Sequence, residues 1–408
     1  MLAVSEFNEI DRLDNLQDLW KSLWERTRDR SFFQTLDWLK GYWRHFGVDS
    51  KLRVLMVSVG GRPIGFVPLV VKTMVTPMGS MRVLTDPLDE WGSFYRPIGP
   101  HPAATLKAAV DYLRTSTRDW DVIDLRHIDA DGSDRGRMLN ALRSNRMTVK
   151  SSVESAVPVI NVDGDFEDYI ERQSDQRRHG IKTAERRLAD RGKLTYRRFR
   201  TNADLRRDES ASWTILSELG RLTSATQRCA GALGVERHLV VHFDCLRELH
   251  DSAAAAGLVD LNLLYLNDEP VAGAYGYQCD GLVEIVHTAS RGRLASVANN
   301  VLMARMLRDS FERQDRRLVF NTATSSLAEG WLTSAVNSHR YTHFAPLAPR
   351  AQLLRANCSL RAWLGDDAPV FSRETSSSVD SEKAPVAEQD DEQPQSEPRQ
   401  LRIFSASV

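Results

Sequence analysis

A short hairpin in the last third of the chain gathers side chains that could transfer protons. Residues 280–281, Asp-Gly, are the signal of a two-residue type I′ turn, which pairs Tyr277 with Glu284 and Tyr275 with Val286. One face then carries a carboxylate beside two phenols, as acyl transfer to an amine or hydroxyl requires. We therefore predict Glu284 and Tyr277 as catalytic and Tyr275 as substrate-binding; alternatively, they are cross-strand partners on a solvated face. The opposite face is mostly small or apolar, as expected for packing against a helix, and consists of Ala274, Gly276, Val283, Ile285 and His287.

The segment after this hairpin could bind an anion. Arg291 and Arg293 flank a glycine just before a helix that we predict at Val297–Arg313. Free backbone amides at a helix N-terminus, with arginines beside them, suit a pyrophosphate. The predicted cofactor-binding residues are Arg291, Arg293, Ser296, Asn299 and Asn300. The serine and asparagines could equally be plain N-caps.

A strongly basic segment, Arg172–Arg200, holds eleven basic and three acidic residues. Ile181, Ala184 and Leu188 recur in it at helical spacing, which predicts a helix with one buried stripe and a basic face. Arg178 and Lys182 lie one turn apart on that helix, and we predict that they bind substrate phosphates. The alternative is a solvated basic face.

Several common active-site motifs are missing. The chain has no P-loop, no GxGxxG after a strand, no GxSxG and no HExxH. His238 and His242 have the spacing of two metal ligands but no evident third ligand, so we expect no metal site. The four cysteines, at 229, 245, 279 and 358, form no CxxC pair, which argues against a disulfide scaffold and favours a reducing cytoplasm.

Composition limits the partners. The 408 residues include 54 Lys and Arg against 55 Asp and Glu, a net charge of -1, so no global field favours nucleic acid. The first residues include neither the basic segment nor the apolar run of a signal peptide, so we expect none. No apolar stretch is long enough to span a membrane. Residues 366–408 carry ten acidic and four basic residues with almost no aromatic ones, which predicts a disordered acidic tail.

The body of the chain reads as two copies of one unit. Three residues recur at an offset of 210: Phe33, Leu39 and Gly47 match Phe243, Leu249 and Gly257. Each set is followed by two expected strands joined by a polar turn and a proline. Chance could also produce such matches. Strands and helices then alternate, with the expected elements at Ala103–Thr115, 121–126, 138–142, the run to Val162, Val297–Arg313 and 317–321. We predict an α+β (mixed α/β) fold of two domains, 1–162 and 163–365, each a mostly antiparallel sheet flanked by helices.

Five segments together resemble a known family. They are FFQTLDWLKGYW, DQRRHGIKTAERRL, LVDLNLLYLNDEPVAGAYGY, RLVFNTATSSLAEGWLTS and HRYTHFAPLAPRAQLLR. Their order over roughly residues 10–363 resembles the tandem GNAT acyltransferases related to Fem-type peptidyl transferases, especially the bacterial group associated with cellulose or exopolysaccharide biosynthesis.

The resemblance implies two GNAT-like domains and an acyl donor, acetyl-CoA or another acyl-CoA, bound where strands separate beside a helix N-terminus. An acceptor amine or hydroxyl would attack the thioester directly. The implied acceptor is a small molecule or carbohydrate, such as a cell-envelope or exopolysaccharide precursor. Near the last strand, where relatives often carry an acidic residue, this chain has Asn321, which we take as a third catalytic candidate. The competing expectation is a catalytically silent binding or scaffold protein with the same fold.

Overall fold

The computed structural model describes residues 2–89, 91–201, 209–231, 237–331, 334–363 and 372–373, without the side chains of 209–212, 225–231, 237–242, 361–363 and 372–373. Residues up to Arg373 form one compact unit. Most of the predicted acidic tail lies outside the described residues. Within it, β13 (Ser372–Arg373) pairs with β3 (Arg62–Thr76), so these two residues form part of the sheet and not of a disordered tail.

The first half of the chain begins with a helical layer and a strand meander. Thr35 caps α2 by accepting the Trp38 N–H at 3.1 Å, and Pro102 opens α3 at the position where a missing N–H costs least. Its helices are α1 (Gln17–Glu25), α2 (Leu36–Phe46), α3 (Pro102–Thr115) and α4 (Arg137–Ser144), with 3₁₀ turns at Ile10–Leu16 and Phe32–Gln34. Its strands are β1 (Leu2–Phe7), β2 (Ser50–Val59), β3, β4 (Gly79–Thr85), β5 (Val122–Asp129) and β6 (Lys150–Asn161).

The second half repeats this pattern. Its helices are α5 (Phe166–Glu171), α6 (Asp175–Ala189), α7 (Glu209–Gly231), α8 (Arg237–Ala255), α9 (Ala295–Glu312), α10 (Ser325–Ala328) and α11 (Pro349–Trp363). Its strands are β7 (Leu194–Arg200), β8 (Val259–Leu266), β9 (Glu269–Cys279), β10 (Leu282–Ser290), β11 (Arg317–Phe320) and β12 (Ser334–Phe344). The predicted helices and strands are present, with ends shifted by a few residues.

The sheet shows the repeat most directly. Six strands run in the order β1-β2-β3-β4-β5-β12, and six run in the order β7-β8-β9-β10-β11-β6. In both sets the first three pairings are antiparallel, the fourth is parallel and the fifth is antiparallel. The predicted fold class, a mixed sheet flanked by helices in a repeated arrangement, is confirmed.

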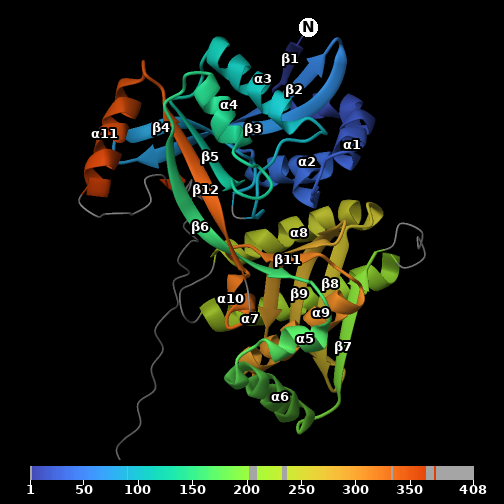
Figure 1. Cartoon of the computed structure of the whole chain (residues 1–408). Helices are drawn as coiled ribbons and strands as arrows, with labels where there is room; N and C mark the ends of the chain where they lie inside the picture. Colours follow the sequence, from blue (N-terminus) through green and yellow to red (C-terminus); the bar gives the residue numbers. More distant parts are fainter. Residues whose placement is uncertain are drawn as a thin grey trace, which may run out of the picture. The chain divides into compact units, whose positions relative to one another are not determined.

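The two halves exchange their last strands (Figure 1). β6 follows the first half in sequence but pairs with β11, whereas β12 returns from the second half to pair with β5. The two exchanged strands also pair with each other, which makes the sheet continuous. α11 then packs against β4 and β12. The domain limits at 162 and 365 stay predictions, although β12 and α11 lie with the strands of the first half.

Two apolar clusters cover the two faces of the second half. One extends from Trp38 and Phe66 of the first half to Tyr275 and Tyr277 under α7 and α8. The other lies between β8–β11 and α9, and also includes Ile181, Ala184 and Leu188 of α6. The predicted apolar stripe of the basic helix is therefore confirmed.

Part of the basic segment is buried in ion pairs. Arg198 and Arg200 on β7 both contact Asp260 on β8 at 2.7 Å, and Asp260 is fully buried. Arg200 also pairs with Asp315 at 2.6 Å. The two arginines hold the pKa of Asp260 down at about 2 despite its burial. They attach the edge strand β7 to the sheet and are not part of an exposed basic face.

Replacing Asp260 with Ala should therefore cost about 3–5 kcal/mol of unfolding free energy, because two buried guanidinium groups would lose a shared partner. Chemical denaturation at pH 7 measures this. In the wild type the stabilisation should be present above the ordinary pKa of Asp, about 3.9, and be lost as the pH falls toward 2.

Asp111→Ala is the matched control. Asp111 pairs with Arg114 at 3.1 Å, but both side chains are at least half exposed. Removing such a pair should cost less than about 1 kcal/mol. Equal losses in the two variants would contradict a stabilising role for the buried cluster.

Candidate active site

The opening between β10 and β11 is the central feature of the second half. The two strands pair in parallel only over Leu282–Ile285 and Arg317–Phe320. β10 then continues to Ser290 along β9, while β11 ends. Beyond Ile285 the strands therefore separate, and α9 begins five residues after the end of β10.

A β-bulge lies at the point of separation. The predicted pairing of Tyr277 with Glu284 is observed, but Tyr275 pairs with His287 and not with Val286. A bulge places two residues of one strand opposite one of its partner, so side chains beyond it change faces. His287 consequently lies on the same side as Tyr275, where its Nε2 is 2.9 Å from Thr223 Oγ1 of α7. Its predicted place on the opposite face was wrong for this reason.

Glu284 lies one residue before the separation and is buried. It is 4% exposed, and burial raises the pKa of its carboxyl to about 7. The nearby Arg96 guanidinium and a hydrogen bond with the Ser31 side chain partly oppose this rise. Since both partners come from the first half, Glu284 faces the contact between the halves. A carboxyl with this pKa can accept a proton near neutral pH.

The two tyrosines of the hairpin are core residues. Tyr277 stacks on Phe32 with ring centroids 4.2 Å apart, and burial raises the pKa of its phenol well above 10. This makes Tyr277 a poor proton donor at neutral pH. The Tyr275 hydroxyl lies 3.1 Å from His250 Nδ1 of α8, and the side chain is fully buried. Neither tyrosine lines the two cavities described below.

Asn321 supports the turn that ends β11. Its Oδ1 accepts hydrogen bonds from the N–H and hydroxyl of Thr324 at 3.0 and 2.8 Å, and its Nδ2 donates to the Trp91 carbonyl at 3.1 Å. The Thr324 hydroxyl is also 2.8 Å from the carbonyl of Ile285, the last residue of β10 that pairs with β11. Asn321 thus helps to shape the opening, and these bonds occupy both ends of its amide.

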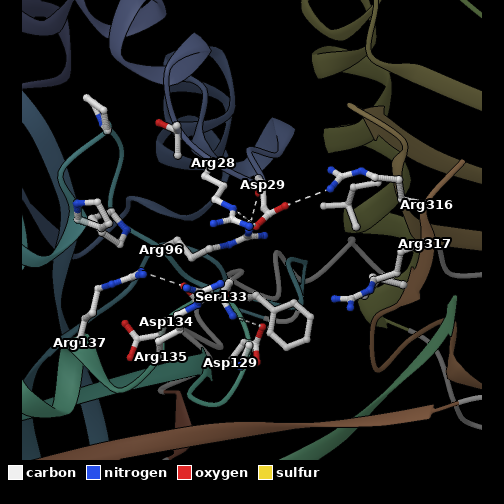
Figure 2. Close-up of a pocket in the computed structure, with 18 of the residues that line it drawn as sticks. Arg28, Asp29, Arg96, Asp129, Ser133, Asp134, Arg135, Arg137, Arg316 and Arg317 are labelled. Atoms are coloured by element: carbon white, nitrogen blue, oxygen red, sulfur yellow. Dashed lines mark hydrogen bonds and ion pairs between the residues drawn. The ribbon is translucent and has the colours of Figure 1, made fainter.

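A cavity of about 790 Å³ lies on the side of the first half, and Glu284 itself is not among the residues that line it. Arg96 lines this cavity. Leu282, two residues before Glu284 on β10, and Val319, the β11 partner of Glu284, line it as well. Figure 2 shows Arg316 and Arg317 on one wall and Arg135 and Arg137 on the other. The lining charged residues are Arg26, Arg28, Arg96, Arg135, Arg137, Arg316 and Arg317 against Asp29, Asp129, Asp134 and Asp163.

This charge balance of seven arginines against four aspartates gives the cavity wall +3. Some of the groups are already paired: Arg316 lies 3.3 Å from Asp29, and Arg96 donates to the Asp29 carbonyl. Burial raises the pKa of Asp134 to about 6, which reduces its negative charge near neutral pH. The cavity therefore favours an anionic ligand.

The predicted cofactor-binding residues gather where α9 begins. Leu294, the N-cap residue, provides no side-chain acceptor for the first turn of α9. Arg291 is half exposed and pairs with Glu269 at 2.9 Å, whereas Arg293 is exposed and makes no ion pair within the described part of the chain. Ser296 is exposed, Asn300 is half-buried, and Asn299 Oδ1 is buried without a described donor. The uncapped amides of the first turn and the two arginines fit the diphosphate end of an acyl-CoA, whereas Asn299 Oδ1, an acceptor, could not bind it.

The equivalent opening in the first half is filled by the chain itself. Between β3 and β5, the Tyr95 N–H donates to the His127 carbonyl at 2.7 Å, and Ile98 pairs with Phe66. A Cβ at Gly99 would lie 2.3 Å from the Ile64 carbonyl oxygen, so only glycine permits this approach. Of the two openings, the one in the second half is therefore the candidate donor site.

Arg178 and Lys182 lie far along α6 from the hairpin and line a second cavity of about 860 Å³. Arg178 donates to the Glu171 carbonyl at 3.2 Å and pairs with Asp175. The structure thus brings these two residues together, but it does not bring them to Glu284. Among the residues it describes there is no group of three potential metal ligands, and the side chains of His238 and His242 lie outside them.

Sequence reasoning missed the arginine-lined cavity. Its seven arginines come from four separate segments of the chain, and only the close spacing of some of them, as in Arg26 and Arg28 or Arg135 and Arg137, is visible in the sequence. None of the described helices has the length and hydropathy needed to span a bilayer.

Comparison with known proteins agrees with this geometry. Residues 175–327 match the acetyltransferase (GNAT) domain family. No curated protein matches the sequence. The crystal structure of FemX is similar, with 11% identity, a TM-score of 0.56 and coverage of 86% of this chain and 99% of that one. A tandem GNAT protein of the clavulanic acid pathway gives 12% identity, a TM-score of 0.41 and coverage of 84% and 98%.

A third structure is the C-terminal domain of a putative lysylphosphatidylglycerol synthetase from Agrobacterium fabrum, with 11% identity, a TM-score of 0.48 and coverage of 83% and 96%. At 11% identity the likeness to FemX bears on the fold alone. The second half therefore contains a GNAT-type acetyltransferase domain, and the expectation that the protein is an acyltransferase is confirmed.

Proposed function

We propose that this protein transfers an acyl group from an acyl-CoA to an amine or hydroxyl of an anionic acceptor, with Glu284 as the proton acceptor. The observation that carries the proposal is the position of Glu284. It is a buried carboxyl with a pKa near 7, at the point where β10 and β11 separate, and its partner on β11, Val319, lines the arginine-lined cavity.

The donor would lie along the second half of β10. Its diphosphate would bind the first turn of α9 with Arg291 and Arg293, and its pantetheine arm would follow β10 toward the bulge. From Ser290 back to Glu284 is six residues of strand, about 20 Å, a length that an extended arm can span. The thioester would then lie next to Glu284.

The acceptor would enter through the arginine-lined cavity, on the other side of Glu284. Arginines there would hold its phosphate or carboxylate groups and orient its nucleophile. An anionic saccharide precursor of the cell envelope or of an exopolysaccharide would meet these requirements, in keeping with the family resemblance.

The proposed reaction is a direct displacement. The acceptor's nitrogen or oxygen attacks the thioester carbonyl carbon, so that a C–N or C–O bond forms and the C–S bond breaks. Glu284 takes the acceptor's proton, and coenzyme A leaves as the thiolate, which takes a proton from water. The alternative, a silent scaffold on the same fold, needs neither donor binding nor the ionisation of Glu284.

Acetyl-CoA should bind with a stoichiometry of one per chain, because the equivalent opening of the first half is filled. Isothermal titration calorimetry measures both stoichiometry and affinity. The double substitution R291A/R293A should weaken binding by roughly 1–3 kcal/mol in total through lost charge-assisted hydrogen bonds.

The matched control is R305A/R313A, which removes one arginine from the middle of α9 and one from its C-cap, away from the first turn, and should leave the affinity unchanged. A wild-type protein that binds no acetyl-CoA would favour the scaffold. Two equal sites, or full affinity in R291A/R293A, would contradict the proposed donor site.

Glu284→Gln should lower kcat about 10²–10⁴-fold while leaving acetyl-CoA affinity intact, the effect of losing a general base. In the wild type, kcat should rise with pH up to about 7 and then level off, since the carboxylate is the active form. Release of free thiol from acetyl-CoA with a panel of anionic amino sugars measures this rate.

A second measurement on the same variant needs no acceptor. The pKa of Glu284 is higher in the folded than in the unfolded protein, so wild-type stability should fall as pH rises from about 4.5 to about 7. Glu284→Gln should remove the part of this fall that Glu284 contributes and leave the part due to Asp134, whereas Glu312→Gln, an exposed control on α9, should retain the whole fall. A wild-type rate in Glu284→Gln would refute the catalytic role, and an unchanged pH dependence of stability would refute the raised pKa.

A further inference from the structure

The last described helix, α11, is apolar on two opposite faces. Its inner face, with Ala351, Leu354 and Cys358, is buried against β4 and β12. Its outer face carries Pro349, Leu353, Ala356 and Leu360 at spacings of four, three and four residues, and all four are exposed. An apolar stripe along a helix is normally covered by another element, so a helix with two such stripes is expected to be covered on both sides. Figure 1 shows α11 at the margin of the first half, beside β4.

The exposure of this outer face is unusual for the chain. Leu347, just before the helix, is 85% exposed, Leu353 is 60% exposed and Leu360 is 55% exposed. Among the described residues only seven large apolar side chains are strongly exposed, and these three belong to one stretch of fourteen residues. We refer to Leu347, Pro349, Leu353, Ala356 and Leu360 as the outer face of α11.

The charge around this face has one sign. Residues 346–363 contain three arginines and no acidic residue. Arg350 and Arg355 are exposed on α11, on either side of the outer face by their helical positions. Arg118 is also exposed, and it lies near His343, whose pKa is lowered by burial and further by the charges of Arg355 and Arg118. The apolar face therefore has a positively charged border.

An apolar face with a positively charged border distinguishes between two possible partners, a second copy of the chain and a lipid surface. In a dimer formed through α11, the arginines of two identical helices would approach each other and repel. An anionic lipid surface satisfies both features, because leucines enter the boundary between headgroups and acyl chains while arginines bind lipid phosphates. We propose that the outer face of α11 binds the surface of an anionic membrane, with the helix lying in the plane of the bilayer.

The inference is independent of the proposed acyl transfer, since α11 contributes no residue to Glu284, to α9 or to the arginine-lined cavity. It describes attachment to a bilayer surface and not a membrane span. The consequence for an acyltransferase would be access to acceptors that are themselves held at the membrane.

Cosedimentation of the full chain with vesicles tests the proposal. The protein should bind vesicles of phosphatidylcholine with 30% phosphatidylglycerol, about the anionic content that attracts arginine-rich surfaces, at least about tenfold more tightly than vesicles of phosphatidylcholine alone. L353S/L360S should weaken that binding about tenfold or more through lost apolar burial. R350Q/R355Q should weaken it by a similar factor and should make the remaining binding less sensitive to salt.

The control V48S/V59S removes two exposed valines far from α11 in sequence and should bind vesicles like the wild type. Because the substituted leucines point outward, the unfolding midpoint of L353S/L360S should also match that of the wild type. Absence of vesicle binding, or equal loss in V48S/V59S, would overturn the proposal. A dimer in light scattering that L353S/L360S converts to monomer would overturn it in favour of self-association.

Discussion

The exchange of β6 and β12 is the constraint on which the rest of the structure depends. Each half forms five strands of its own sheet and takes its sixth from the other half. An unpaired sheet edge exposes a row of backbone donors and acceptors, so neither half has a complete sheet without the other. The exchange therefore fixes the position of one repeat against the other and closes both edges at the contact between them.

The buried Glu284 depends directly on that contact. Its carboxyl lies on the second half, yet the groups that share its site, Ser31 and Arg96, come from loops of the first half. Burial opposes ionisation of the carboxyl and the nearby guanidinium favours it. The pKa of Glu284 is therefore about 7, well above that of a solvated glutamate. A single GNAT-like unit with the same hairpin would leave this face open to water and would lose the shift.

The sequence predicts the frame of the site better than its details. The Asp280-Gly281 turn was enough to pair Tyr277 with Glu284, because a two-residue turn fixes the register of the residues next to it. The bulge at Val286 was not predictable, since no glycine or proline signals it, and it changed the face of His287. The start of a helix soon after β10, preceded by Arg291 and Arg293, was predictable, whereas donor binding at that loop stays a prediction.

The arginine-lined cavity shows why other parts could not be predicted. Arg96 and Arg316 are more than two hundred residues apart and meet only because β12 and β6 join the halves. Conversely, Arg198 and Arg200 have the sequence appearance of an exposed basic run, but Asp260 and Asp315 neutralise them inside the protein. Local composition records charge, whereas tertiary pairing decides whether that charge is available to a ligand.

The two repeats have diverged in what fills the opening between their parallel strands. In the first half the segment around Tyr95 and Ile98 hydrogen-bonds to both neighbouring strands, and Gly99 permits its close approach. In the second half a short loop leads directly from β10 into α9 and leaves the strands apart. The filled repeat cannot hold a donor in the same way, but its filling segment carries Arg96 to the wall beside Glu284. One repeat thus contributes the opening and the other contributes the wall of a single composite site.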